Sequence, residues 1–468
     1  MVAAESPGPR AAQIAALIET EIIRRGWPVG ESLGSEAALQ LQYSASRSVL
    51  REAVRLVEHH QVARMRKGPN GGLVITEPDA APATRAMVIY LEYAGVTIDE
   101  LLAARLLLEP LASGLAAERI DEAGIDRLRT SLAASGSPRR HDEFHVALAE
   151  LTGNPVLALF VDILTRLTAR YALDTRLPSE SEVSDTVRRL SADHAGIVEA
   201  ITAGDSARAK TLTGEHVRMV TDWLRQHYRS GTRRAAPAVT EPGKRAEVLA
   251  TQIRRDIAAG GWRTGSVFGA EADLLERYAV SRSVLREAVR LLEYHTVARM
   301  RRGPGGGLIV TEPQPGPALD TVALYLEYRR PTAGDVRQVR EAIEVDNVVT
   351  VVERRDDPTV AAFLADHAAA EVPPPEVERV GQAELCFHNG IADLAGNRVL
   401  NMFLAILAEL VRRHWTPTQQ PVPAAADVAD MHHAHVRIIE AIRSGDASLA
   451  QHRSRRHLEA LSSWWMHA

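Results

Sequence analysis

The chain has 468 residues, which at about 100–200 residues per domain predicts roughly three domains. Its composition, 46% hydrophobic and 25% charged, is that of a globular protein and excludes a disordered, fibrous or membrane-embedded chain. Aromatic residues make up only 4%, which favours helix-on-helix cores over a β-sandwich. The formal net charge is −5, so any binding to nucleic acid depends on local basic patches.

The start of the sequence indicates the cellular compartment, and the cysteine content limits which disulfide and metal sites are available. The first residues, MVAAESPGPR, lack the pattern of a secretory signal, and no run of about 18 apolar residues occurs, so we expect a cytoplasmic protein with no membrane partner. The single cysteine, Cys386, supplies neither an intramolecular disulfide nor a CxxC zinc site. A bound metal would therefore use histidine and carboxylate ligands.

The chain repeats itself. Residues 46–65, SRSVLREAVRLVEHHQVARM, and residues 281–300, SRSVLREAVRLLEYHTVARM, are identical at 17 of 20 positions. Each copy has a first segment that is nearly the same in both and a longer second segment that has diverged. A stretch rich in Pro, Gly and Thr near residue 236 predicts an exposed linker, so the chain is a fusion of two copies rather than a solenoid.

The first segment predicts short helices, a tight turn and a β-hairpin. In copy one, apolar residues at helical spacing are followed by a break at Trp27–Gly30, a short segment at about 35–41 and a turn at 43–45. Ser46 is suited to N-cap the next helix, on which Arg47, Arg51 and Arg55 point away from an apolar stripe. The strands VARMR and LVIT flank the turn GPNGG, with Lys67 at the tip. This order predicts a winged helix-turn-helix.

The basic face of the predicted helix suits DNA, because the major groove admits one α-helix and Arg binds guanine or phosphate bidentately. We expect Arg47 and Arg51 to read bases, Arg55 to bind phosphate, and Lys67 to reach the backbone or the minor groove. The predicted DNA-contacting residues are Ser46, Arg47, Arg51, Arg55, Lys67 and Gly68 in copy one, and Ser281, Arg282, Arg286, Arg290, Arg302 and Gly303 in copy two. The alternative is that these arginines are only the solvated face of an amphipathic helix.

Both first segments resemble a known family of DNA-binding domains. LGSEAALQLQYSASRSVLREAVRLVE and FGAEADLLERYAVSRSVLREAVRLLE are similar to the DNA-binding domain of GntR-superfamily regulators of the FadR type. Some proteins of that type carry a DNA-contacting Arg just after the Glu of the first motif. Ala37 and Ala272 occupy that position here, so the resemblance implies a different operator at the corresponding base.

The second segments carry histidines at matched places. His194 and His216 flank Gly204-Asp205 in a predicted helical hairpin, and His435 and His457 flank Gly445-Asp446 in the same way. Glu384 and His388 are four residues apart and share one helical face. Three His and a carboxylate suit a divalent ion such as Zn, Ni, Mn or Fe, more so in the second copy. The alternative is that these histidines form hydrogen bonds within a core.

The sequences FHVALAELTGNPVL and FHNGIADLAGNRVL, with the two His hairpins, resemble the all-helical FCD effector domain of FadR-type regulators. The resemblance implies a metal bound beside a small carboxylate effector. By this resemblance, the metal ligands of copy two are Glu384, His388, His435 and His457. Those of copy one are Asp142 or His141 with His145, His194 and His216. The resemblance also implies that Arg105 and Arg340 clamp the effector, although each is equally suited to a surface pair with Glu109 or Glu344 four residues on.

We therefore expect a mainly α protein with two winged helix-turn-helix domains and two all-helical FCD-type bundles. The predicted segments are 8–78, DNA-binding domain 1; 82–228, effector domain 1; 229–243, linker; 244–313, DNA-binding domain 2; and 317–468, effector domain 2. The expected function is a transcriptional regulator, most simply a repressor, that binds a double-stranded inverted-repeat operator as a monomeric pseudo-dimer or after further self-association. The alternatives are a metal-dependent enzyme, for which no P-loop, HExxH or nucleophile elbow is present, and an architectural DNA protein, which the net charge of −5 disfavours.

Overall fold

The computed structural model describes residues 9–68, 71–134, 138–172, 180–227, 245–301, 303, 305–373, 376–415 and 424–466. The predicted linker at 229–243 and Arg302 lie outside these residues, as do the side chains of His141 and Asp142. The described residues form twenty helices and five short strands, which confirms the mainly α fold. No helix among them is both long and apolar enough to cross a bilayer.

By packing, the chain divides into two units, and each unit contains parts of both copies. The first unit is Met1–Gly95 with Ser230–Arg329, and the second is Val96–Arg229 with Arg330–Ala468. The first unit therefore holds both winged domains, and the second holds both helical bundles.

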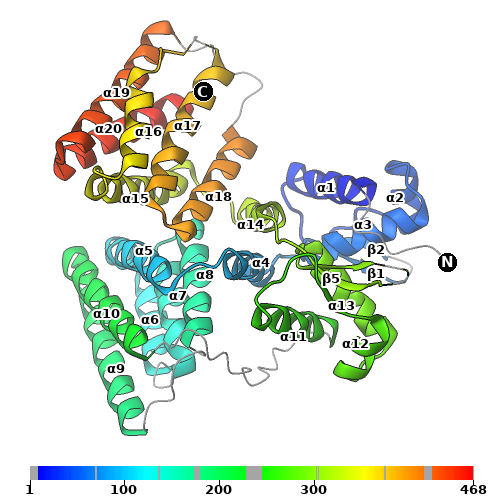
Figure 1. Ribbon diagram of the computed structural model, residues 1–468. Helices are drawn as coiled ribbons and strands as arrows, with labels where there is room; N and C mark the ends of the chain where they lie inside the picture. The colour runs from blue at the N-terminus through cyan, green and yellow to red at the C-terminus, as the bar shows by residue number, and fades with distance from the viewer. Residues whose placement is uncertain are drawn as a thin grey trace. The chain divides into compact units, whose positions relative to one another are not determined.

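In the first unit, each copy folds as three helices, a β-hairpin and a following helix (Figure 1). Copy one comprises α1 (Pro9–Arg24), α2 (Glu36–Gln42), α3 (Arg47–His59), β1 (Ala63–Arg66), β2 (Gly72–Ile75) and α4 (Ala80–Tyr93). Copy two comprises α11 (Arg245–Ala259), β3 (Val267–Gly269), α12 (Glu271–Tyr278), α13 (Arg282–Tyr294), β4 (Ala298–Arg301), β5 (Gly307–Val310) and α14 (Pro315–Arg329). The predicted cap is confirmed, because the Ser46 side chain accepts a hydrogen bond from the amide of Val49.

The wing contains a strand that the sequence did not predict. In copy two, β3 pairs with β5 on the side opposite β4, and in copy one Ser32 forms a single bridge with Val74. Gly72 and Gly307 begin the inner strands at φ values of +143° and +144°. A Cβ at either position would lie 2.5 Å from a backbone carbonyl oxygen of the extra strand or bridge segment, so only glycine permits this close approach.

Each winged domain is completed by the helix that follows the other copy's wing. Leu324 of α14 lies in the core of the first winged domain, beside residues of α1 and α3. Ile89 of α4 lies in the core of the second. Two aromatic pairs also join the copies. The ring centroids of Trp27 and Tyr328 lie 5.3 Å apart, and those of Trp262 and Tyr93 lie 5.2 Å apart. Neither core is complete within its own copy.

The two winged domains meet through a buried cluster of aromatic and histidine rings. His60 bonds through Nδ1 to Glu19 at 2.6 Å and through Nε2 to the hydroxyl of Tyr294, which also bonds Thr321. The rings of His59 and His295 lie 5.3 Å apart. Burial lowers the pKa of His59 well below its usual value and that of His295 to about 3, so both rings are neutral at pH 7.

In the second unit each copy forms a bundle of six helices. Copy one comprises α5 (Ile98–Arg119), α6 (Glu122–Ala134), α7 (Pro138–Glu150), α8 (Pro155–Ala172), α9 (Glu180–Thr202) and α10 (Ser206–His227). Copy two comprises α15 (Ala333–Glu353), α16 (Pro358–Ala369), α17 (Val377–Ala395), α18 (Arg398–Trp415), α19 (Ala425–Ser444) and α20 (Ala447–Met466). The predicted His-bearing hairpins are confirmed as α9–α10 and α19–α20.

The two bundles contact each other through matched residues of both copies. Phe160 stacks on Phe403 with ring centroids 3.9 Å apart. Asn154 donates from Nδ2 to the carbonyl of Asp335, and Asn397 donates in the same way to the carbonyl of Glu100. These two contacts place the start of α8 against α15 and the start of α18 against α5.

Candidate metal centres and DNA-binding surface

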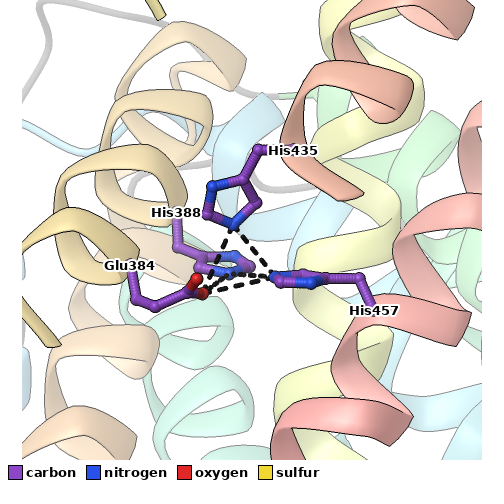
Figure 2. Close-up of side chains that lie close together, drawn as sticks. All are labelled: Glu384, His388, His435 and His457. Carbon is purple, nitrogen blue, oxygen red and sulfur yellow. Dashed lines mark hydrogen bonds and ion pairs between the residues drawn. The ribbon is translucent and has the colours of Figure 1, made fainter. Parts of the chain in front are cut away.

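Four side chains of copy two converge between α17, α19 and α20 (Figure 2). Glu384 and His388 lie one turn apart on α17, as their spacing predicted, and the turn between α19 and α20 brings His435 to face His457. Oε2 of Glu384 lies 3.3 Å from Nε2 of each of the three histidines. Nε2 of His457 is 3.2 Å from that of His388 and 3.0 Å from that of His435.

This donor set fits a divalent metal ion. The Oε2 atom of Glu384 is buried and faces the three Nε2 atoms at equal distances, as a shared ligand of one ion would. Five separations among the four ligand atoms lie between 3.0 and 3.3 Å. Ligand atoms around a tetrahedral ion with bonds of about 2.0–2.1 Å are roughly 3.3 Å apart, so one cation can contact all four. Three imidazoles and a carboxylate also match the chemistry of Zn, Ni, Mn or Fe.

The protonation of the cluster favours metal binding. Burial lowers the pKa of His435 to about 4 and also lowers that of His457, so both are neutral at pH 7. Burial raises the pKa of Glu384, but the surrounding histidines outweigh it and hold that pKa well below its usual value. Burial lowers the pKa of His388, but Glu344 and Glu384 outweigh it and raise that pKa to about 9, so His388 is protonated at pH 7 in the metal-free site. The site therefore presents a carboxylate and two neutral imidazoles, and a metal ion would displace one proton from the third.

An Arg–Glu pair, buried in copy one and partly buried in copy two, contacts the histidine of the FH motif in each copy. Nδ1 of His388 lies 2.6 Å from Oε2 of Glu344, whose other oxygen accepts a hydrogen bond from Nε of Arg340 at 2.5 Å. Burial raises the pKa of Glu344, but Arg340 and His388 outweigh it and lower the pKa to about 2. A carboxylate on Nδ1 fixes the tautomer that leaves Nε2 for a metal.

Copy one repeats this arrangement with Arg105, Glu109 and His145. Arg105 and Glu109 are buried, so the pair that their spacing predicted forms inside the bundle rather than on its surface. Glu109 and Glu344 were expected only as partners of the arginines, and their contact with histidine was not predicted. The shared spacing of Arg, Glu and the FH motif in both copies was the available signal.

The histidines of copy one also converge. His145 on α7, His194 on α9 and His216 on α10 are all buried, and their ligand atoms lie within 4.8 Å of one another. Nε2 of His194 is 3.3 Å from Nε2 of His216. Asp193, which was not predicted as part of the site, lies 3.2 Å from Nδ1 of His216, and Ala434 takes its place in copy two.

The predicted DNA-contacting arginines are exposed on both helices that follow the tight turn. Arg47, Arg51 and Arg55 lie on α3, and their counterparts lie on α13. Glu36 of α2 accepts hydrogen bonds from Arg47 at 3.1 Å and from Arg51 at 2.7 Å. In copy two the corresponding ion pair, Arg282 with Glu271, is longer at 3.7 Å. Glu36 therefore positions both predicted base-reading arginines of copy one.

The remaining predicted contacts lie near the junction of the winged domains and at the wing tips. Burial and the charge of Arg55 both lower the pKa of Arg290, because these two phosphate-binding candidates lie within electrostatic reach of each other. Lys67 is exposed, and Gly68 and Gly303 have φ values of +117° and +94° in the hairpin turns.

Comparison with known families agrees with both parts of the structure. The FCD domain matches residues 100–219 and 335–460, a little over half of the chain. The family of bacterial regulatory proteins named gntR matches residues 245–307, the second winged domain. The chain belongs to the GntR family of regulators with FCD domains. This regulator carries the FCD domain twice and is a DNA-binding transcriptional regulator.

Each of several individual relatives of the regulator matches less than half of the chain. The HTH-type transcriptional regulator LutR of Bacillus subtilis is 28% identical over 209 residues, 42% of this chain and 94% of LutR. The Uxu operon regulator of Haemophilus influenzae is 26% identical, over 44% of this chain and 79% of that protein. The transcriptional repressor NanR of Cronobacter sakazakii is 29% identical, over 43% and 80%. The solved structure of Streptococcus agalactiae GntR is 23% identical, covers 45% of this chain and 99% of that protein, and has a TM-score of 0.31.

Proposed function

We propose that the regulator binds an inverted-repeat operator as an intramolecular pseudo-dimer, with α3 reading one half-site and α13 the other. The near identity of these helices supports equivalent half-sites, because the same side chains would face the same bases. The exchange of α4 and α14 between the winged domains supports the pairing, since each core depends on the other copy.

The regulator represses transcription until a small carboxylate binds beside a metal ion in the helical domains. The observation that carries this proposal is the convergence of Glu384, His388, His435 and His457 on one point. A bound divalent ion would supply positive charge and open coordination positions for a carboxylate. In copy one His145, His194 and His216 would hold the ion. The relative NanR is named a repressor, which supports the direction of the effect.

Arg340 and Arg105 would add the second contact to the effector. Each guanidinium is anchored through Nε on a buried glutamate that also touches a metal-ligand histidine. This places a fork of donors next to the metal ligands, where it can bind a carboxylate through two hydrogen bonds.

Selection of binding sites from a random DNA library tests the operator proposal, with the mass of the complex measured by light scattering. We expect an enriched inverted repeat bound by one 51.0 kDa chain. Salt-sensitive binding with no enriched sequence would refute sequence-specific reading.

The sensor role is tested by His435→Ala, with His433→Ala as the control on an exposed position of the same helix. Acetate, lactate and succinate are first screened for release of the parent protein from the selected operator. We expect the His435 variant to bind that operator normally but not to be released from it by the acid that releases the parent protein. The control variant should respond as the parent does. Turnover of the acid by the parent protein would instead support the enzyme alternative.

A further inference from the structure

A cavity of about 580 Å³ lies between the two helical bundles of the second unit. It is bounded by α5 of copy one and by α15 and α20 of copy two. This volume is within the range of about 300–1,000 Å³ that is typical of small-molecule sites. None of the predicted metal ligands lines it, so it is separate from the metal centres.

The cavity combines an apolar wall with several arginines. Leu107, Leu111 and Val345 form the apolar part, and Arg119, Arg337 and Arg455 form the basic part. A ligand with an apolar body and a charged end would therefore contact both kinds of surface.

The polar wall is a feature of copy two alone. Arg337, Gln338 and Glu341 line the cavity from α15. The aligned positions of α5 in copy one carry Leu102, Ala103 and Leu106. The face of α15 that lines the cavity is thus polar, whereas the aligned face of α5 is apolar, although both bundles descend from the same duplicated segment.

The acidic residues of the cavity are already engaged. Glu341 accepts a hydrogen bond from Arg455 at 2.9 Å. The carboxylate of Asp335 accepts bonds from the amide and the hydroxyl of Thr332 in the cap of α15. Burial and the charge of Glu353 raise the pKa of Asp346, which disfavours its charged form.

Two arginines remain to bind a ligand. Arg337 is exposed and has no ion pair or side-chain hydrogen bond within the part of the chain that the structure describes. Arg119 donates one bond from Nη1, to the carbonyl of Thr152. These two guanidinium groups therefore have donors left for a ligand, which favours an anion.

We propose that this cavity is a second ligand site, which takes a small organic anion with an apolar body and a carboxylate or phosphate end. Such a ligand would contact α5 of one bundle and α15 of the other, so its binding would couple the two effector domains. The site is independent of the metal-dependent effector site proposed above.

Isothermal titration of the full chain in EDTA tests the proposal with octanoate and octyl phosphate as probes, and octylamine as the control of opposite charge. We expect one site per chain for at least one of the two anions and none for octylamine. The two anions distinguish a carboxylate ligand from a phosphate ligand. Arg337→Ala should weaken anion binding about tenfold, as expected for loss of a charge-assisted contact.

Two further variants keep the test decisive. Ala342→Trp fills the cavity from the half-buried surface of α15 and should abolish binding. Arg129→Ala removes an exposed arginine of α6 that does not line the cavity and should leave binding unchanged. The proposal is overturned if neither anion binds, if octylamine binds as well, or if Arg337→Ala and Ala342→Trp have no effect. Binding that requires metal and disappears in His435→Ala would assign the anion to the metal site instead. None of these readouts uses DNA, so they are separate from the tests of the regulator's function.

Discussion

At the scale of single residues, the candidate metal centre includes supporting side chains that would not touch the ion. His388 faces Glu384 with Nε2 and Glu344 with Nδ1, and Glu344 in turn holds Arg340. One carboxylate thus fixes both a ligand histidine and the arginine proposed to bind the effector. Its loss should affect the two partners together.

Glu344→Gln should weaken metal binding roughly 10–100-fold, because the amide no longer fixes the Nδ1–H tautomer of His388 as a carboxylate does. Glu344 is a positioning residue, so the measurement is Zn²⁺ affinity by competition with a chelator, alongside the melting temperature of the metal-free protein. Glu353→Gln, at an exposed position of the same helix, is the control. An unchanged Zn²⁺ affinity in Glu344→Gln would show that the contact is only structural.

Substitutions on α3 should separate base reading from phosphate binding. We expect Arg47→Ala to cost about 1–3 kcal/mol of operator binding and to relax specificity at one base pair. Arg55→Ala should weaken binding to DNA of any sequence by the same factor. It should also reduce the salt dependence of binding by about one phosphate contact. Fluorescence anisotropy with operator and scrambled DNA at several salt concentrations measures both. Equal losses on both DNAs for Arg47→Ala would contradict its role as a base reader.

The sequence was sufficient to predict the residues of the copy-two cluster, because i,i+4 spacing and a hairpin around Gly-Asp define which side chains share a face. It was not sufficient for the residues that support them. Glu109 and Glu344 reach histidine across helices, and Asp193 acts on His216 from the neighbouring helix of the hairpin. Local periodicity shows which face of a helix is apolar, but not which other helix that face meets.

At the scale of elements, the exchange of α4 and α14 determines how the winged domains are built. The helices α1–α3, the cap at Ser46 and the hairpin were predictable, since caps, turns and amphipathic stripes are local signals. The core in which Leu324 is buried was not predictable, because its partners there are residues of the other copy. The short strand β3 was missed for a related reason, as three residues carry too little pattern.

Leu324→Ala should destabilise the first winged domain, although Leu324 follows the second winged domain in the sequence. Removal of a buried leucine costs about 2–5 kcal/mol, and Leu324 is only 3% exposed. Hydrogen exchange of the full chain should show faster exchange in α1 and α3 than in α11 and α13. Ile89→Ala is the mirror variant and should affect α11 and α13 instead. Loss of protection confined to the second winged domain in Leu324→Ala would contradict the exchange of helices.

At the scale of the whole molecule, the contact between the helical bundles is not symmetric. Arg398 bonds both oxygens of Glu100, whereas Pro155 occupies the position of Arg398 in copy one. Burial raises the pKa of Glu100, but hydrogen bonds from Arg398 and Thr97 outweigh it and lower the pKa to about 2. The charged form of Glu100 is therefore favoured in the folded protein.

This ion pair should make stability depend on pH in an acidic window. Because the pKa of folded Glu100 is below its ordinary value of 4.5, its contribution is present above about pH 4.5 and is lost as the pH falls toward 2. Glu100→Gln keeps the helix cap but should remove on the order of 1 kcal/mol near neutral pH, since Arg398 is partly exposed. Urea unfolding between pH 3 and 7 measures the difference, which should shrink toward low pH. Glu122→Gln, exposed at the start of α6, is the control. A difference that grew on acidification would contradict the pairing.

The crossing of α4 and α14 also changes how the regulator responds to its own abundance. A regulator built from separate subunits dissociates when it is scarce, so occupancy of its operator falls with the square of subunit concentration. Here both readers belong to one polypeptide, and dilution cannot separate them. For a regulator that reads its operator as proposed, occupancy then falls only in direct proportion to the number of chains, so scarcity lowers occupancy less steeply than it would for separate subunits.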